Sequence, residues 1–77
     1  MTLREIRESK NIKAKDTAKV LGVALSTVLM WELGHRKPKM SNIGKLAELY
    51  GESCLTVMAA VQGVDVKEFL DKLKKSK

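Results

Sequence analysis

Hydrophobic residues recur along the chain at intervals of three and four, in short blocks separated by glycine or asparagine. This spacing is typical of amphipathic helices, and no stretch of useful length shows the alternation of a strand. The first block opens with Thr2 and Glu5 in the spacing of a capping box, carries Leu3 and Ile6 on one face, and ends at Asn11. The pattern therefore predicts an all-α protein made of short helices.

Five more helices are predicted from the same pattern. Two of them span residues 14–21 and 25–33, and each is followed by a glycine that can end a helix in the left-handed conformation. Each of the other three follows a residue whose side chain can cap a helix N-terminus. These are Ser41 before residues 42–50, Ser53 before a helix that reaches Gly63, and Asp65 before the last helix. Residues 35–39 are expected to form a basic loop, because Pro38 interrupts a helix.

Length and composition exclude several classes of function. A chain of 77 residues is expected to form one domain, and its three aromatic residues are too few for a base-stacking surface. One cysteine and one histidine exclude a disulfide framework and a zinc site of several cysteines. Cys54 is expected to be a small buried residue rather than a redox switch. No hydrolase, nucleotide-loop or metalloprotease motif occurs, so we expect no enzyme, no catalytic residue, no cofactor and no metal.

The sequence has neither a membrane-spanning apolar run nor the pattern of a secretion signal, so we expect a soluble, cytoplasmic protein. Its charge is uneven. The net charge is +6, and residues 1–40 hold nine basic and four acidic side chains. An excess of this size on one half of a domain is typical of a face that binds a polyanion, although a generic solvated surface would look the same in composition.

The spacing Ala18-xxx-Gly22-xxxxx-Val28 is that of a DNA-binding helix-turn-helix, in which a small residue lets two helices cross, glycine makes the turn and valine fills the crossing. From Leu3 to about Leu55 the chain resembles the Cro and phage-repressor class of helix-turn-helix proteins, often called XRE-type. The resemblance runs in order through residues 3–7, 18–23, 26–28, 31–32, 34–38 and 45–51.

This resemblance implies a compact five-helix, lambda-repressor-like bundle. It also implies a protein encoded by a bacterium, phage or mobile element, which binds double-stranded operator DNA as a dimer. The helix over residues 25–33 would be the recognition helix. Its implied base-facing residues are Leu25, Ser26 and Met30, with Thr27 and Leu29 at the margin. The implied phosphate contacts are Lys13, Ala14, Lys15, His35, Arg36, Lys37, Lys39, Ser41 and Asn42, although a lone loop histidine is more often merely solvated. Arg7 and Glu32 would form a largely buried ion pair.

The chain also departs from the family pattern. Ala14 stands where the family usually has a phosphate-binding glutamine, and Ala24 stands where it usually has a capping Ser or Thr. Leucine and methionine occupy the usual polar reading positions, namely Leu25, Leu29, Met30 and Leu33. This apolar surface has three interpretations: contact with DNA, docking of a protein partner, or packing of Leu33 and Leu29 under neighbouring loops.

We therefore expect a sequence-specific DNA-binding transcriptional regulator of the repressor type. The alternative is a protein-interaction module on the same fold, an antirepressor or assembly factor that uses this apolar surface to bind its partner.

The C-terminal segment lies beyond the resemblance. We divide the chain into a helix-turn-helix domain over residues 1–63 and a C-terminal helix over residues 64–77. Val66, Phe69, Leu70 and Leu73 form one apolar stripe on that helix. A helix this short needs a surface to lie on, so it either packs on the first and fifth helices or meets a second copy of the chain. We expect a weak homodimer that DNA strengthens.

Overall fold

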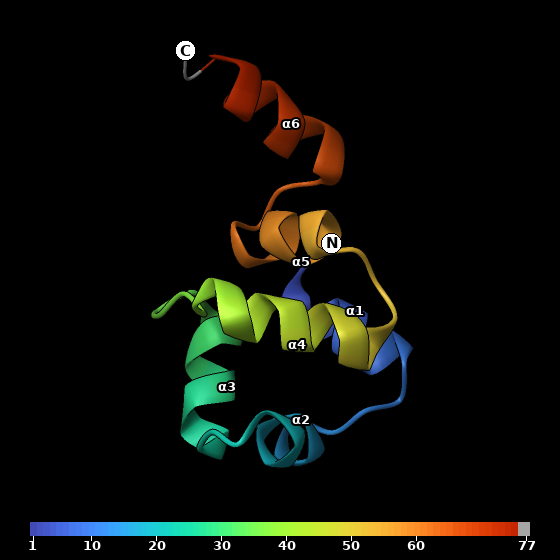
Figure 1. Ribbon diagram of the computed structural model, residues 1–77, viewed down its shortest axis with the longest axis vertical. Helices are drawn as coiled ribbons and strands as arrows, with labels where there is room; N and C mark the ends of the chain where they lie inside the picture. The colour runs from blue at the N-terminus through green and yellow to red at the C-terminus, as the bar shows by residue number, and fades with distance from the viewer. Residues whose placement is uncertain (76–77) are drawn as a thin grey trace.

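The computed structural model describes residues 1–75, which form an all-α structure of six helices, as the sequence pattern predicts (Figure 1). The helices are α1 (Leu3–Ser9), α2 (Ala14–Leu21), α3 (Leu25–Leu33), α4 (Met40–Tyr50), α5 (Cys54–Val61) and α6 (Val66–Lys75). All helices in the described chain are too short or too polar to span a bilayer.

Local capping explains most of the helix ends. The Thr2 hydroxyl accepts from the Glu5 amide at 3.1 Å, and the Glu5 carboxylate accepts from the Thr2 amide at 2.7 Å, so the predicted capping box is present. Hydrogen bonding of the carboxylate to Thr2, chiefly to its backbone amide, lowers the pKa of Glu5 because it favours the charged form. Asn11, just after α1, has the left-handed backbone conformation, with φ of 57°. At the start of α6, the Asp65 carboxylate accepts from the Glu68 amide at 2.7 Å.

Two local predictions were wrong. Ser41 does not cap α4, which begins earlier, at Met40, with Lys39 as its N-cap. The restriction that Pro38 imposes ends with the loop, and the chain turns helical two residues later, so Ser41 is already inside the helix. Cys54 is exposed rather than buried, because the inward face of α5 starts one turn later, at Val57.

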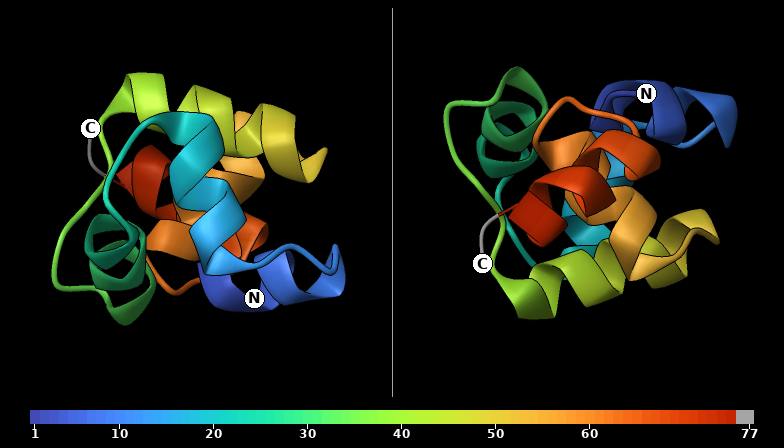
Figure 2. Two further views of the ribbon diagram at one scale, coloured as in Figure 1. Left: turned by 90° about the horizontal axis from the view of Figure 1, so that it is seen from below. Right: turned by 90° about the horizontal axis from the view of Figure 1, so that it is seen from above.

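The core lies where α1 to α5 meet. Ile6, Val28, Leu46 and Val57 are almost completely buried, one each from α1, α3, α4 and α5. α2 packs most extensively against α3, and α4 packs against α5. Figures 1 and 2 show α5 lying between the other four of these helices and α6. This packing fixes α3 from behind and leaves its other face outside.

One polar contact lies inside this core. The Thr17 hydroxyl of α2 and the Tyr50 hydroxyl of α4 are 3.0 Å apart, and Thr17 is fully buried. Burial raises the pKa of Tyr50, although the hydrogen bond with Thr17 opposes the shift. The contact joins the first helix of the turn motif to the helix that supports it.

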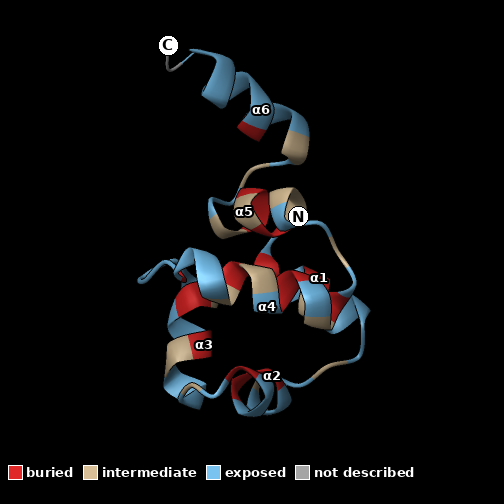
Figure 3. Ribbon diagram, in the orientation of Figure 1, coloured by how far each residue is buried: buried red, intermediate tan, exposed pale blue. Residues whose placement is uncertain are grey.

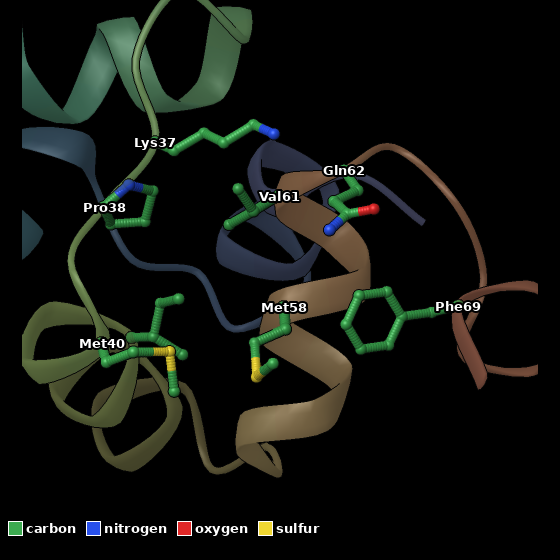
Figure 4. Close-up of a pocket in the computed structure, with 8 residues that line it drawn as sticks. Lys37, Pro38, Met40, Met58, Val61, Gln62 and Phe69 are labelled. Atoms are coloured by element: carbon green, nitrogen blue, oxygen red, sulfur yellow. The ribbon is translucent and has the colours of Figure 1, made fainter. Parts of the chain in front are cut away.

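α6 extends from the opposite end of the molecule to α2, along a longest dimension of 37 Å (Figure 1). It packs against α5 through Phe69, its one buried residue among those described, and its remaining surface is mostly exposed (Figure 3). Phe69 points toward Met58 at the edge of a hollow of about 180 Å³, where α4, α5 and α6 meet (Figure 4). Leu70 and Leu73 are 39% and 49% exposed.

Candidate nucleic-acid interface

The turn between α2 and α3 is short and well defined. Gly22 ends α2 with φ of 71°, and the amide of Val23 donates to the carbonyl of Ala18 at 3.0 Å. Ala18 and Val28 are buried at the crossing of the two helices, as the spacing predicts. A small residue at Ala18 lets α3 approach, and Val28 fills the space between them. The two helices are therefore held in one relative orientation.

An ion pair between α1 and α3 fixes α3 from a second side. Arg7 donates from Nε to Glu32 Oε2 at 2.6 Å and from Nη2 to Oε1 at 3.2 Å, and its Nη1 donates to the Ile12 carbonyl at 2.9 Å. The two side chains are only 11% and 5% exposed. The hydrogen bonds with the Glu32 carboxylate raise the pKa of Arg7.

The face of α3 that remains outside is almost entirely apolar. Val28 and Trp31 point into the core, and Glu32 points toward α1. The residues left on the outer face are Ser26, which is exposed, and four apolar side chains: Leu25 (43% exposed), Leu29 (42%), Met30 (41%) and Leu33 (69%). Of the residues expected to face bases, only Thr27 is partly buried. The exposure of Leu33 contradicts the interpretation that it packs under a neighbouring loop.

A hollow next to this outer face was not foreseen from the sequence. It has a volume of about 360 Å³ and lies where α1 passes α3, with Thr2, Arg4, Leu29 and Leu33 among its lining residues. Arg4 therefore borders the apolar face, while its side chain pairs with Glu8 at 3.3 Å. No local signal identifies Arg4, because its position depends on how α1 and α3 cross.

The basic loop over residues 34–39 follows directly from α3. It is anchored by the amides of His35 and Arg36, which both donate to the Met30 carbonyl, and by the buried Pro38. The loop and α3 lie along the same edge of the molecule in all three views (Figures 1 and 2). The side chains of His35, Arg36, Lys37 and Lys39 are exposed there.

The other expected phosphate contacts lie at the starts of α2 and α4. Lys13 and Lys39 are the N-caps of α2 and α4, and neither side chain accepts a hydrogen bond from the first turn. A lysine ammonium has no acceptor atom, so the leading amides of both helices stay available to an anion. Lys15 and Ser41 are exposed beside them. Ala14 packs partly against the core, and Asn42 lies partly buried in a hollow with Thr27, Arg36 and Lys39.

The remaining chemistry of the surface is sparse. Nowhere in residues 1–75 do three His, Cys, Asp or Glu side chains gather in a way that could hold a metal ion. What the face offers is apolar side chains in the centre and cations with helix amides on either side.

Two helices joined by a glycine turn, the second with its outer face uncovered, define a helix-turn-helix protein. Comparison with known proteins agrees with this class. Residues 3–56 match the family described as helix-turn-helix, so the chain belongs to that family. The match agrees with the expectation that the chain is not an enzyme, and it covers the whole segment on which the resemblance to XRE-type proteins rests.

Two curated relatives extend this result. The chain is 38% identical over 52 residues to the HTH-type transcriptional regulator AnsR of Bacillus subtilis (strain 168). The matched segment covers 68% of this chain and 45% of that protein. It is 33% identical over 49 residues to the cryptic phage CTXphi transcriptional repressor RstR of Vibrio cholerae, which covers 64% of this chain and 44% of that protein. The chain thus spans about half the length of these relatives. No solved structure matches it at a significant level.

Proposed function

We propose that this protein is a sequence-specific DNA-binding transcriptional regulator of the repressor type. The observation that carries the proposal is the uncovered outer face of α3 between two groups of cations at helix starts. A helix fits the major groove, and the groove is bordered by phosphates on both sides. The names of the two relatives, a transcriptional regulator and a transcriptional repressor, support the same function.

In this proposal the phosphate backbone supplies most of the attraction. The leading amides of α2 bind one phosphate beside Lys13 and Lys15, and those of α4 bind a second beside Lys39. Arg36 and Lys37 extend the second contact, with His35, Ser41 and Asn42 as minor partners. These contacts set the position of the protein on the duplex, and α3 then meets the base edges.

The salt dependence of DNA affinity tests this arrangement. If the five cations Lys13, Lys15, Arg36, Lys37 and Lys39 each neutralise one phosphate, log affinity should fall against log salt with a slope of about −4.5. Fluorescence anisotropy with a labelled duplex measures the slope. A value flatter than about −2 would contradict the proposed contacts.

A pair of charge variants makes the test local. Lys37→Gln should weaken binding to every duplex and flatten the slope by about 1. Lys67→Gln removes the same charge from α6, outside the proposed phosphate contacts, and should leave the slope nearly unchanged. Equal effects of the two variants would mean that net charge, rather than the proposed contacts, drives binding.

The alternative function is a protein-interaction module, and the apolar outer face of α3 is the observation that favours it. The same titration separates the two functions. Binding of every duplex at micromolar concentration, unchanged by Leu29→Ala and Met30→Ala, would favour a protein partner on α3. A preference among sequences that changes with Met30→Ala would favour DNA.

We also propose that residues 64–77 are an addition to a domain over residues 1–63, and that this addition supports a weak homodimer. The support is the exposed part of α6 at Leu70 and the small hollow where α4, α5 and Phe69 of α6 meet. Phe69 contacts its own α5, so a dimer would use the outer side of the stripe, with Val66 and Leu73 contributing. Sedimentation at rising concentration tests the dimer, which Leu70→Gln should weaken without unfolding α6.

A further inference from the structure

The hydrogen-bonding capacity of α3 limits how it can distinguish base pairs. Ser26, Thr27 and Glu32 are the polar residues of the helix, which contains no Asn, Gln, Arg or Lys. Both Glu32 oxygens accept from Arg7. Thr27 is partly buried, and a single hydroxyl at Ser26 can serve any base. The helix therefore has no side chain that can bind guanine or adenine through two hydrogen bonds.

The apolar side chains that remain are matched by one feature of the major groove. Each base pair presents donors and acceptors there, and the one apolar group among them is the 5-methyl group of thymine. Leu25, Leu29 and Met30 expose about two-fifths of their surface on the first two turns of α3. In this class of protein the first turns of the second helix approach the bases. Leu33 lies at the far end of the helix, beside Arg4, and is not part of this argument.

Charge complementarity selects DNA rather than a protein as the occupant of this face. Arg4 lies beside it, the cationic loop follows directly from α3, and Lys13 and Lys15 are exposed at the start of α2, the helix that packs against α3. Two helix N-termini with lysine N-caps lie at the start of the α2–α3 motif and at the end of the loop that follows it. A hydrophobic face within such a border fits a groove that has methyl groups on its floor and phosphates along its edges.

We propose that α3 distinguishes base pairs chiefly through the 5-methyl groups of thymine, which Leu25, Leu29 and Met30 contact in the major groove. This inference rests on the proposed DNA-binding function and names the chemistry of its recognition. The preferred duplex then has A·T pairs under these three side chains. Removing one contacted methyl group should weaken binding about fourfold, which is the effect of taking one methyl group out of an apolar contact.

Uracil substitution tests the proposal on the DNA side, without changing the protein. The whole chain is first used to select its preferred duplex from a random pool. Each thymine is then replaced singly by uracil, which lacks the methyl group and keeps the same pairing and the same carbonyl in the groove. We expect losses of about fourfold at two or three positions, measured by anisotropy at one salt concentration. As a second test, the thymine at such a position is replaced by cytosine, with guanine opposite. 5-Methylcytosine in the same place should bind better than cytosine, because it restores the methyl group.

Protein variants assign each methyl group to a side chain. Met30→Ala and Leu29→Ala should each abolish the uracil effect at one position, so that the duplexes with thymine and uracil bind equally there. Val20→Ala is the control, since Val20 is an exposed apolar residue on α2 outside the proposed DNA and dimer contacts, and should leave every uracil effect in place. Thermal unfolding followed by circular dichroism checks that the variants fold.

The outcomes distinguish this inference from the function on which it rests. A selected duplex that binds with the expected salt slope but loses nothing with uracil would overturn methyl reading and leave DNA binding intact. A chain that selects no duplex would overturn both, and the apolar face of α3 would then be assigned to a protein partner.

Discussion

The ion pair between Arg7 and Glu32 should be the most costly side-chain contact to break from one side. The perturbation is a double-mutant cycle of Arg7→Met, Glu32→Met and the variant that carries both. Each single change leaves one charge without its partner at a position that is about nine-tenths buried. Arg7→Met also removes the donor to the Ile12 carbonyl.

The expected magnitude follows from this burial. Removing one partner of a buried pair costs about 3–5 kcal/mol, and two apolar residues of similar volume restore much of that loss. A domain of this length has a free energy of unfolding of about 4–12 kcal/mol, so either single variant should be near the limit of folding. Arg7→Met should be the less stable of the two, because it also leaves the Ile12 carbonyl without its donor. The double variant should be more stable than either single variant.

Urea unfolding followed by the fluorescence of Trp31 measures these values, since Trp31 is the one tryptophan of the chain and is buried on α3 directly before Glu32. The control is the Lys10–Glu52 pair, whose charged atoms are 3.0 Å apart but whose side chains are 38% and 30% exposed. Lys10→Met should cost less than about 1 kcal/mol. If the double variant loses the sum of the two single losses, the pair is not coupled and the reasoning fails.

Three further predictions concern other parts of the fold. Burial raises the pKa of Tyr50, so the contribution of the neutral phenol to stability is complete below pH 10 and should decrease as pH rises beyond it. Tyr50→Phe should flatten this decrease in urea titrations and cost about 1–3 kcal/mol at neutral pH, because the Thr17 hydroxyl loses its partner. Adding Thr17→Val should reduce that cost. Gly22→Ala should cost about 1–2 kcal/mol through its left-handed backbone alone, because no atom lies within 4 Å of the added Cβ, and a loss below 0.5 kcal/mol on thermal unfolding would contradict this strain. Phe69→Ala should lower the free energy of unfolding by about 3 kcal/mol and reduce the helical signal, whereas the exposed Leu70→Ala should cost less than about 1 kcal/mol.

The helix boundaries were predictable because local chemistry determines them. A capping box at Thr2 and left-handed residues at Asn11 and Gly22 act within a few residues of the chain. The start of α4 was mispredicted where two local signals compete, since a serine that can cap lies just after the proline loop. The helix begins at Met40, with Lys39 as its N-cap, so this serine lies inside the first turn.

The candidate site was predictable only in part. The outward direction of Leu25, Leu29 and Met30 follows from helical spacing once Val28 and Trp31 are assigned to the core. The hollow beside Arg4, the burial of Pro38 and the exposure of Cys54 depend on how far each helix extends past its neighbour. Such distances arise from tertiary packing, and a single sequence contains no local signal for them.

If the proposed phosphate contacts form, the lysine N-caps of α2 and α4 link the stability of the fold to DNA binding. A Ser, Asp or Asn in place of Lys13 or Lys39 would satisfy a leading amide and stabilise the helix by about 1 kcal/mol. The same change would remove a cation and fill the position that a phosphate occupies in the proposed complex. No side chain caps either helix start, and in the proposed complex the phosphates of the duplex accept from these leading amides. In that complex DNA stabilises the folded state, so its binding should raise the melting temperature most in variants in which the first turn of α2 or α4 is weakened.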